Sequence, residues 1–318
     1  MTVSEKIRSI GILPVINIKK EEWAEPLANT LIRSGIPAIE IVLRNEKALS
    51  ILEGMKKNHP DMTVGAGTVL SVEQAEAAVA AGADFLVSPG YSQAIVDFCN
   101  ERGVLYVPGC TSASDIQAAY SSGLRTVKFF PAEQLGGIKT IKQLAAPFAG
   151  MRFIPTNGMT LDNIASYLCE DCIAACGGSY MAPAATLEAE DFEKIESLCK
   201  KAVLNSLGFS LAHVGVNCEG DDDALRTAQA FCSAFLLPVI GKGKSVFAGA
   251  AVECMKHNGR GEKGHIGFRT LSVDRAVAYL QKQGFEFLPE TAGYDANGSL
   301  KYIYLKDEIA GFALHLVK

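Results

Sequence analysis

The chain contains no apolar run long enough to span a lipid bilayer. Its apolar stretches, such as residues 10–18, are short and are interrupted by Pro14 and Asn17, whereas a membrane-spanning helix needs about 20 apolar residues. The first residues, 1–8, carry charges of both signs and do not lead into the apolar segment of a signal peptide. We therefore expect a soluble, cytoplasmic protein with no membrane partner.

The chain also lacks an excess of positive charge. Lysine and arginine number 30 against 35 for aspartate and glutamate, so the net charge is −5 and the pI is near 5.6. This balance provides no basic surface for nucleic acid or for an anionic membrane. A phosphate group could still be held locally by backbone amides. The expected partner is a small molecule rather than nucleic acid.

Cysteine is too sparse for a disulfide framework. The nine cysteines are dilute in a chain of 318 residues and odd in number, which favours reduced thiols. Three of them, Cys169, Cys172 and Cys176, have a spacing that could suggest a metal site. Their neighbours, among them Leu168 and Ile173, are apolar. We therefore predict buried structural cysteines, with metal binding as the alternative.

Between residues 12 and 205, β-rich runs alternate with helical stretches, and each run ends at a glycine, a proline or a small polar residue. The eight predicted strands are residues 13–17, 38–43, 63–69, 85–88, 105–108, 126–131, 152–156 and 173–177. Eight βα units close most readily into a parallel (β/α)8 TIM barrel, because right-handed crossovers place every helix outside. An open, doubly wound sheet is the alternative.

The remainder of the chain contains a weak internal repeat. Segments 212–216 and 264–268 are each followed by a helical stretch and then by β-rich segments. Two βαβββ modules, joined by the polar connector 257–263, explain this repeat. The sequence thus predicts an α/β barrel over residues 1–205 and an α+β domain over residues 206–318.

Lys128 lies in a predicted barrel strand between Val127 and Phe129. Burial among apolar side chains disfavours an ammonium group and leaves part of such a lysine as a free amine, which can attack a carbonyl. The sequence therefore suggests a Schiff-base nucleophile. The plainer interpretation is a strand lysine whose amino group reaches the surface.

Polar residues cluster at the predicted carboxyl ends of the strands, where parallel barrels place their active sites. They are Glu40, Arg44, Thr68, Lys128 and Thr156. Glu40 lies between two isoleucines, where burial suits a carboxylate to proton transfer. A structural ion pair of Glu40 with Lys128 or Arg44 is the alternative.

These residue types together suit a 2-oxo acid. Arginine and hydroxyl groups bind its carboxylate, lysine condenses with its ketone, and glutamate moves protons. This is the chemistry of class I aldol cleavage, in which the iminium withdraws electrons from the bond that breaks. A sugar-phosphate epimerase or isomerase on the same barrel is the alternative enzyme.

Two small, glycine-containing turns follow the seventh and eighth predicted strands. They are Pro-Thr-Asn-Gly at residues 155–158 and Gly-Gly-Ser at residues 177–179. Barrels usually bind phosphate at the ends of these two strands, where backbone amides face the ligand. The two turns therefore predict a phosphate site.

The ends of successive predicted strands resemble the 2-keto-3-deoxy-6-phosphogluconate (KDPG) aldolase family, also described as 4-hydroxy-2-oxoglutarate (KHG) aldolase. The matching segments are residues 38–44, 64–70, 88–90, 107–109, 127–133, 153–158 and 177–179, within about residues 5–203. The resemblance implies a homotrimer that cleaves KDPG to pyruvate and glyceraldehyde 3-phosphate without a cofactor. The shorter 4-hydroxy-2-oxoglutarate, which yields pyruvate and glyoxylate, is a second implied substrate.

The resemblance also implies roles for individual residues. Lys128 would form the Schiff base, and Glu40 would be the general acid and base, acting through a water. The implied substrate contacts are Arg44, Thr68 and Thr156 at the pyruvate carboxylate, Pro89 and Phe130 at the pyruvyl portion, and Gly158, Gly178 and Ser179 at the phosphate. Asn157 is a departure, because the family commonly has a Gly-Gly pair at residues 157–158. This difference concerns phosphate binding and hence the length of the substrate.

Residues 209–318 resemble the vicinal-oxygen-chelate fold of glyoxalases and extradiol dioxygenases. The resemblance rests on the two module starts and on the later segments 251–255 and 313–317. The implied ligands of a divalent metal are His213, Glu253, His265 and His315, the last being more often glutamate. Imidazoles and a carboxylate suit zinc, nickel or iron. Histidines that only pack the sheet, in a sensor or assembly module, are the alternative.

Overall fold

The structure is a computed structural model that describes residues 1–296 and 298–318. The chain divides into two compact units, Met1–Ser206 and Leu207–Lys318. Among the described residues, no helix is both long enough and apolar enough to cross a membrane.

The N-terminal unit contains a ring of eight parallel strands. They are β1 (Ile12–Ile16), β2 (Ala38–Val42), β3 (Thr63–Gly67), β4 (Phe85–Ser88), β5 (Leu105–Pro108), β6 (Thr126–Phe129), β7 (Arg152–Pro155) and β8 (Cys176–Gly178). Six strands pair in the order β5-β4-β3-β2-β1-β8, and β6 pairs with β7. Bridges from Gly109 to Lys128 and from Thr156 to Gly177 join the two sets and close the ring. The predicted barrel is confirmed, and the open doubly wound sheet is wrong.

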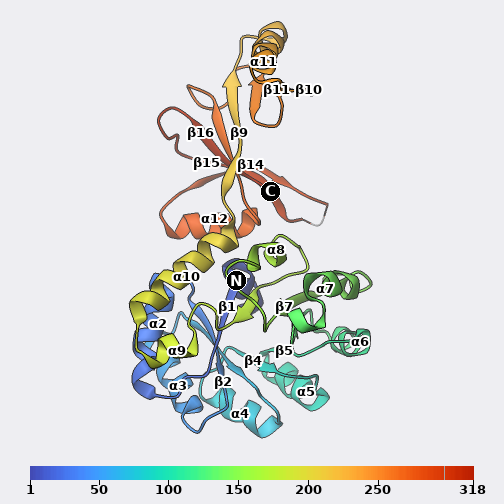
Figure 1. The fold of residues 1–318 in the computed structure, drawn as a ribbon. Coiled ribbons are helices and arrows are strands. Elements are labelled where there is room, and N and C mark those ends of the chain that lie inside the picture. Colours follow the sequence, from blue (N-terminus) through green and yellow to red (C-terminus); the bar gives the residue numbers. More distant parts are fainter. Residues whose placement is uncertain (297) are drawn as a thin grey trace. The chain divides into compact units, whose positions relative to one another are not determined.

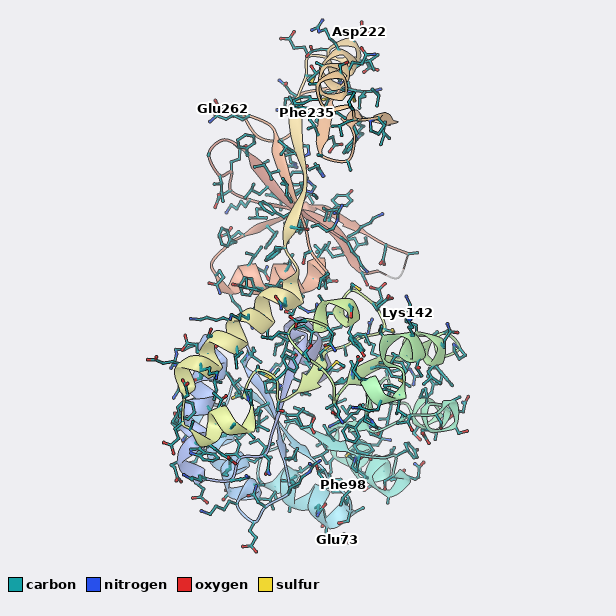
Figure 2. All side chains as sticks on the ribbon, in the orientation of Figure 1. Glu73, Phe98, Lys142, Asp222, Phe235 and Glu262 are labelled. Atoms are coloured by element: carbon teal, nitrogen blue, oxygen red, sulfur yellow. The ribbon has the colours of Figure 1, made fainter. Side chains whose placement is uncertain are left out.

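Helices surround this ring (Figure 1). They are α1 (Val3–Ile10), the short η1 (Glu21–Trp23), α2 (Ala24–Arg33), α3 (Ala48–Asn58), α4 (Val72–Ala80), α5 (Gln93–Arg102), α6 (Ala113–Ser121), the short η2 (Glu133–Leu135), α7 (Gly137–Ala145), α8 (Ile164–Leu168), α9 (Ala184–Glu188) and α10 (Phe192–Leu207). Local sequence fixes several starts: Ser112 and Asp115 form a reciprocal capping box at α6. Charged side chains on the helices, such as Glu73 and Lys142, point outward and are exposed (Figure 2).

The barrel interior is packed with side chains rather than open. Every residue of β2, β3 and β4 is buried. Gly65 shows how tight the packing is, because a Cβ atom there would lie 2.2 Å from the ring of Phe85. A ligand can therefore enter only at an end of the strands, as in other barrels of this type.

The eighth strand differs from its prediction. It is Cys176–Gly178, whereas Ile173, the predicted start, makes only an isolated bridge to Phe153. The prediction of buried cysteines is correct for Cys176 alone in this cluster, because Cys169 is exposed and Cys172 is partly exposed. These two residues lie in the turn after α8, where the chain runs over the surface before it enters the sheet.

The described residues of the C-terminal unit form a single mixed sheet with two helices, α11 and α12. Its elements are β9 (Ser210–Asn217), α11 (Asp221–Phe235), β10 (Val239–Lys242), β11 (Ser245–Ala248), β12 (Val252–Met255), β13 (His265–Arg269), α12 (Val273–Lys282), β14 (Phe287–Tyr294), β15 (Leu300–Leu305) and β16 (Ala313–Val317). The order β10-β11-β12-β9-β13-β16-β15-β14 places the first strands of the two modules together at the centre. The two predicted βαβββ modules are confirmed.

Candidate active site

Lys128 on β6 and Glu40 on β2 meet inside the barrel. Nζ of Lys128 donates a hydrogen bond to Oε1 of Glu40 at 3.0 Å, and the two residues are 8% and 1% exposed. Gly67 on β3 makes room for the carboxylate, because a Cβ atom there would lie 2.3 Å from Oε1. The surface-lysine interpretation is wrong. A proton can pass directly between the amine and the carboxylate at this distance.

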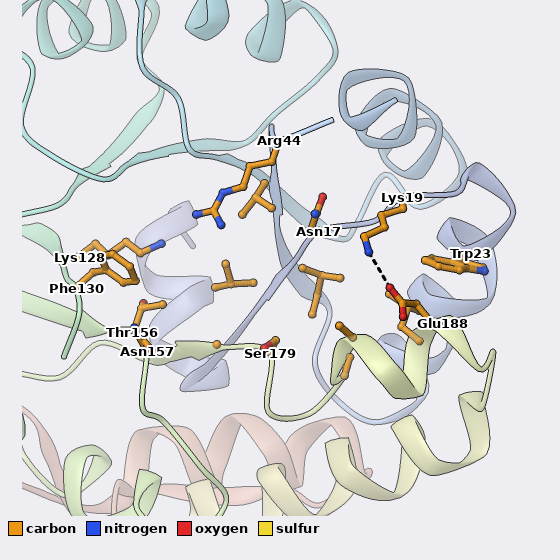
Figure 3. Close-up of a pocket in the computed structure, with 17 residues that line it drawn as sticks. Asn17, Lys19, Trp23, Arg44, Lys128, Phe130, Thr156, Asn157, Ser179 and Glu188 are labelled. Carbon is orange, nitrogen blue, oxygen red and sulfur yellow. Dashed lines mark hydrogen bonds and ion pairs between the residues drawn. The ribbon is translucent and has the colours of Figure 1, made fainter. Parts of the chain in front are cut away.

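Arg44 follows β2 and reaches the end of β3. Its Nε donates a hydrogen bond to Oγ1 of Thr68 at 3.2 Å. Thr68 has a φ of +62°, a left-handed conformation that is rare for a β-branched residue. Strained backbone of this kind is often found at functional sites. Figure 3 shows the guanidinium of Arg44 directed toward the amino group of Lys128.

A cavity of about 400 Å³ opens beside Lys128. Six of the predicted site residues line it: Arg44, Lys128, Phe130, Thr156, Gly178 and Ser179. The side chain of Lys128 approaches Phe130, with Nζ 6.0 Å from the ring centroid. The volume lies in the range of small-molecule sites. The walls of the cavity come from the ends of β1, β2, β6, β7 and β8 and from α9 (Figure 3).

Four predicted residues do not line this cavity. Glu40 and Thr68 reach it only through their hydrogen-bonding partners. Pro89 is exposed, and its carbonyl packs against Gly109, where a Cβ atom would lie 2.0 Å away. The carbonyl of Gly158 accepts a hydrogen bond from the side chain of Asn163 at 2.9 Å.

The turn after β7 is hydrogen-bonded to the segment that leads into η2. The backbone N–H of Ala132 donates to the carbonyl of Thr156 at 2.9 Å. Tyr167 donates a hydrogen bond to Glu133, and burial together with that carboxylate raises the pKa of Tyr167. Asn157 lines the cavity with a φ of +75°. That conformation favours glycine and is tolerated by asparagine, which is how this chain accommodates its departure at residue 157.

Other polar residues line the cavity without having been predicted. They are Asn17, Lys19, Trp23 and Glu188. Asn17 and Lys19 directly follow β1, so the strand-end rule that selected Glu40 and Thr68 also applied to them, whereas Trp23 lies farther along the chain in η1. Glu188 lies in α9, and nothing in the local sequence distinguishes it from other surface acids.

The four predicted metal ligands converge in the C-terminal unit. Nε2 of His213 lies 3.2 Å from Nε2 of His265 and 3.1 Å from Nε2 of His315. Oε2 of Glu253 lies 3.2 Å from Nε2 of His265 and 3.3 Å from Nε2 of His213. Ligands about 2.0–2.1 Å from a tetrahedral ion are separated by roughly 3.3–3.4 Å. The spacing therefore fits one bound ion.

Two glycines create the space for these imidazoles. A Cβ atom at Gly215 would lie 2.0 Å from the ring of His265, and one at Gly267 would lie 2.6 Å from Nε2 of His315. Each glycine faces ligands on both neighbouring strands: Gly215 pairs with Glu253 and His265, and Gly267 pairs with His213 and His315. Any larger residue at either position would push the rings apart.

The electrostatics of this cluster favour a neutral imidazole at His315 and an ionised carboxylate at Glu253. Burial, together with the charges of His213 and His265, lowers the pKa of His315 to about 4. Burial alone would raise the pKa of Glu253, but hydrogen bonds from His265 and Ser245 outweigh it and lower that pKa. A neutral imidazole and an ionised carboxylate are the forms in which these two residues can bind a divalent metal.

Comparison with known proteins gives a consistent set of matches. A family profile described as KDPG and KHG aldolase matches residues 3–198. The 2-dehydro-3-deoxy-phosphogluconate aldolase of Treponema pallidum (strain Nichols) is 40% identical over 203 residues, which are 64% of this chain and 97% of the relative. The KHG/KDPG aldolase of Escherichia coli (strain K12) is 37% identical over 203 residues, covering 64% of this chain and 95% of the relative.

Solved structures give the same result for the fold. The KDPG aldolase from Legionella pneumophila, in which pyruvate was captured as a covalent carbinolamine intermediate, superposes with a TM-score of 0.61 at 33% identity. That match covers 64% of this chain and 98% of the other. An aldolase from Zymomonas mobilis ZM4, solved with 3-phosphoglycerate, gives a TM-score of 0.60 at 34% identity and covers 63% of this chain and 94% of the other.

Proposed function

We propose, because the chain belongs to the KDPG and KHG aldolase family, that its N-terminal unit cleaves KDPG to pyruvate and glyceraldehyde 3-phosphate as a class I aldolase. The observation that carries this proposal is the buried pair of Lys128 and Glu40 beside the cavity. The shorter 4-hydroxy-2-oxoglutarate is a second substrate. By the same family resemblance we propose a homotrimer, which sedimentation analysis would test.

The reaction follows from the two buried groups. The amine of Lys128 attacks the C2 carbonyl, and loss of water gives an iminium. Glu40, through a water, takes the proton of the C4 hydroxyl as the C3–C4 bond breaks, and the iminium receives the electron pair. The aldehyde leaves, the resulting enamine is protonated at C3, and hydrolysis of the iminium releases pyruvate.

The remaining residues bind the substrate. We assign Arg44, Thr68 and Thr156 to the carboxylate, Pro89 and Phe130 to the pyruvyl portion, and Gly158, Gly178 and Ser179 to the phosphate. The hydrogen bond from Arg44 to Thr68 supports the first group, because it fixes the guanidinium near the amine that attacks C2.

Reductive trapping tests this proposal. The protein is incubated with pyruvate and borohydride, and its peptides are mapped by mass spectrometry. A class I aldolase gains a reduced pyruvyl adduct. A sugar-phosphate epimerase or isomerase, which needs no iminium, gains none, and that result would contradict the proposal.

We expect a preference for the phosphorylated six-carbon acid over its unphosphorylated form and over 4-hydroxy-2-oxoglutarate. A hydrogen bond to a charged group contributes about 1.5–3 kcal/mol, so kcat/KM should differ by roughly 10- to 100-fold. A coupled assay of pyruvate release measures all three. Equal efficiencies would mean that the turns at Asn157 and Gly178 do not bind phosphate.

A second function is supported by the histidine cluster. We propose that the C-terminal unit binds one divalent metal ion, such as zinc, nickel or iron, through His213, Glu253, His265 and His315. The close approach of the three imidazoles, the contacts of Glu253 with two of them, and the two glycines that make room for the rings support this proposal. A metal-dependent sensor or an independent catalyst would each use such a centre.

Metal uptake by the full-length protein is the corresponding prediction. After treatment with a chelator and dialysis, the protein should take up about one zinc, nickel or iron ion per chain, measured by elemental mass spectrometry. His213→Ala and Glu253→Gln should lose this ion, whereas His257→Ala, an exposed histidine outside the cluster, should retain it. Equal metal uptake by all variants would contradict the proposed site and would mean that these histidines only pack in the sheet.

The aldolase reaction serves as the internal control for that experiment. Because the iminium is the electron sink, pyruvate release should be the same before and after chelation. Cleavage that fell with the chelator and returned with the ion would show that the two units are not chemically separable.

A further inference from the structure

The cavity of the N-terminal unit has a second charged end. Figure 3 shows Lys128 at one end of the lining, Ser179 in the middle, and Lys19 and Glu188 at the other end. Lys19 follows β1, the first strand of the barrel. Glu188 is the last residue of α9, which follows β8, the last strand of the barrel. A substrate that is bound at Lys128 and extends along this cavity would direct its distal end toward these two residues.

Lys19 and Glu188 form an exposed ion pair. Nζ of Lys19 lies 2.7 Å from Oε1 of Glu188, and the two side chains are 56% and 51% exposed. The hydrogen bond from Lys19, together with its charge, lowers the pKa of Glu188. An exposed pair of this kind contributes little to stability. Lys19 can therefore exchange this partner for another anion at little cost.

The loop that carries Lys19 is held by other contacts. The indole Nε1 of Trp23 donates a hydrogen bond to Oε1 of Glu190 at 3.0 Å. Nζ of Lys20 lies 3.6 Å from the same oxygen and 4.9 Å from the ring of Trp23. Lys20 does not line the cavity. Two adjacent lysines thus differ in position: Lys20 pairs with Glu190 outside the cavity lining, whereas Lys19 lines the cavity.

We propose that Lys19 is a specificity-determining residue that binds the terminal phosphate of the substrate in place of Glu188. This inference rests on the proposed aldolase function. Of the three cations in the described lining, Arg44 and Lys128 serve the keto-acid end, and Lys19 serves the phosphate end. The amides of Gly178 and Ser179 supply hydrogen bonds to phosphate but no net charge.

The difference in charge between phosphate and carboxylate favours the exchange of Glu188 for phosphate as the partner of Lys19. A phosphate monoester carries about −1.5 to −2 at pH 7, against −1 for a carboxylate, so it attracts Lys19 more strongly than Glu188 does. Glu188 then lies near a dianion and would repel it if Lys19 were absent. Removal of Lys19 therefore both deletes an attraction and exposes a repulsion.

The test compares Lys19→Gln with Lys20→Gln, a matched change at the neighbouring position. The readout is the ratio of kcat/KM for phosphorylated and unphosphorylated six-carbon substrates. Lys19→Gln should lower this ratio by roughly 10- to 100-fold, mainly through KM, and should weaken the salt dependence of the phosphorylated substrate. Lys20→Gln should leave both unchanged. Glu188→Gln should lower KM for the phosphorylated substrate.

Two results would overturn the assignment. One is an unchanged ratio in Lys19→Gln, and the other is an equal fall in Lys20→Gln. Trapping with pyruvate and borohydride separates this failure from failure of the aldolase proposal, because pyruvate carries no phosphate. If Lys19→Gln still forms the trapped pyruvyl adduct and its ratio of kcat/KM values is unchanged, only the proposed role of Lys19 is contradicted. If the unsubstituted protein forms no trapped pyruvyl adduct, both the aldolase proposal and the role of Lys19 are contradicted.

Discussion

Lys128→Arg is expected to abolish both the borohydride-trapped pyruvyl adduct and aldol cleavage. A guanidinium remains protonated at every accessible pH, so it cannot attack a carbonyl. It still supplies a positive charge opposite Glu40, so the loss would not come from an unpaired buried carboxylate. Removal of a covalent nucleophile can cost on the order of 10⁶ in kcat. Pyruvate release should therefore fall to background.

The matched control is Lys142→Arg. Lys142 is an exposed lysine on α7 that pairs with Glu170 at 2.7 Å, away from the cavity. This variant should label and turn over normally. Labelling that persists in Lys128→Arg, or activity that survives there, would contradict the assignment of the nucleophile.

Glu40→Gln should still form some iminium but lose turnover by about 100- to 10,000-fold. The amide is nearly isosteric and can accept the hydrogen bond from Lys128, yet it cannot take or return a proton. Exchange of the methyl protons of pyruvate in deuterated water, followed by NMR, should fall to a similar extent. Near-normal exchange would show that another group moves the proton.

Stability needs a separate check in this variant. Lys128 loses its buried countercharge, and removal of one partner from a buried pair is usually destabilising. We therefore expect a lower melting temperature, and exchange should be measured well below it. Glu170→Gln, which removes the exposed partner of Lys142, provides the control for a glutamate whose loss leaves catalysis unaffected.

The barrel and the buried pair could be predicted because their patterns are local. Each strand ends at a residue type that stops it, and a charge between apolar neighbours, as at Glu40 and Lys128, is conspicuous in the sequence alone. The eighth strand was misplaced because residues 173–177 form an unbroken run of small and apolar residues. Such a run does not indicate where pairing with β1 begins.

The rest of the site depends on contacts between distant segments. Glu188 looks like an ordinary surface acid in the sequence, and its place in the site appears only where α9 meets Lys19 in the loop after β1. Gly215 and Gly267 gain meaning only from the register that sets each one between ligands on both sides. The repeat predicted the succession of strands and helices along the chain. The space for the imidazole rings became apparent only from the pairing of strands in the sheet.

The central pairing of β9 with β13 divides the metal cluster between the two halves of the repeat. One half supplies His213 and Glu253, and the other supplies His265 and His315. An ion held by all four would join positions 102 residues apart in the sequence, a span that is entropically costly to close in an unfolded chain. Such an ion would act as a removable cross-link, adding about 2.7 kcal/mol of stability at a concentration 100 times its Kd. Either half alone would retain only two of the donors.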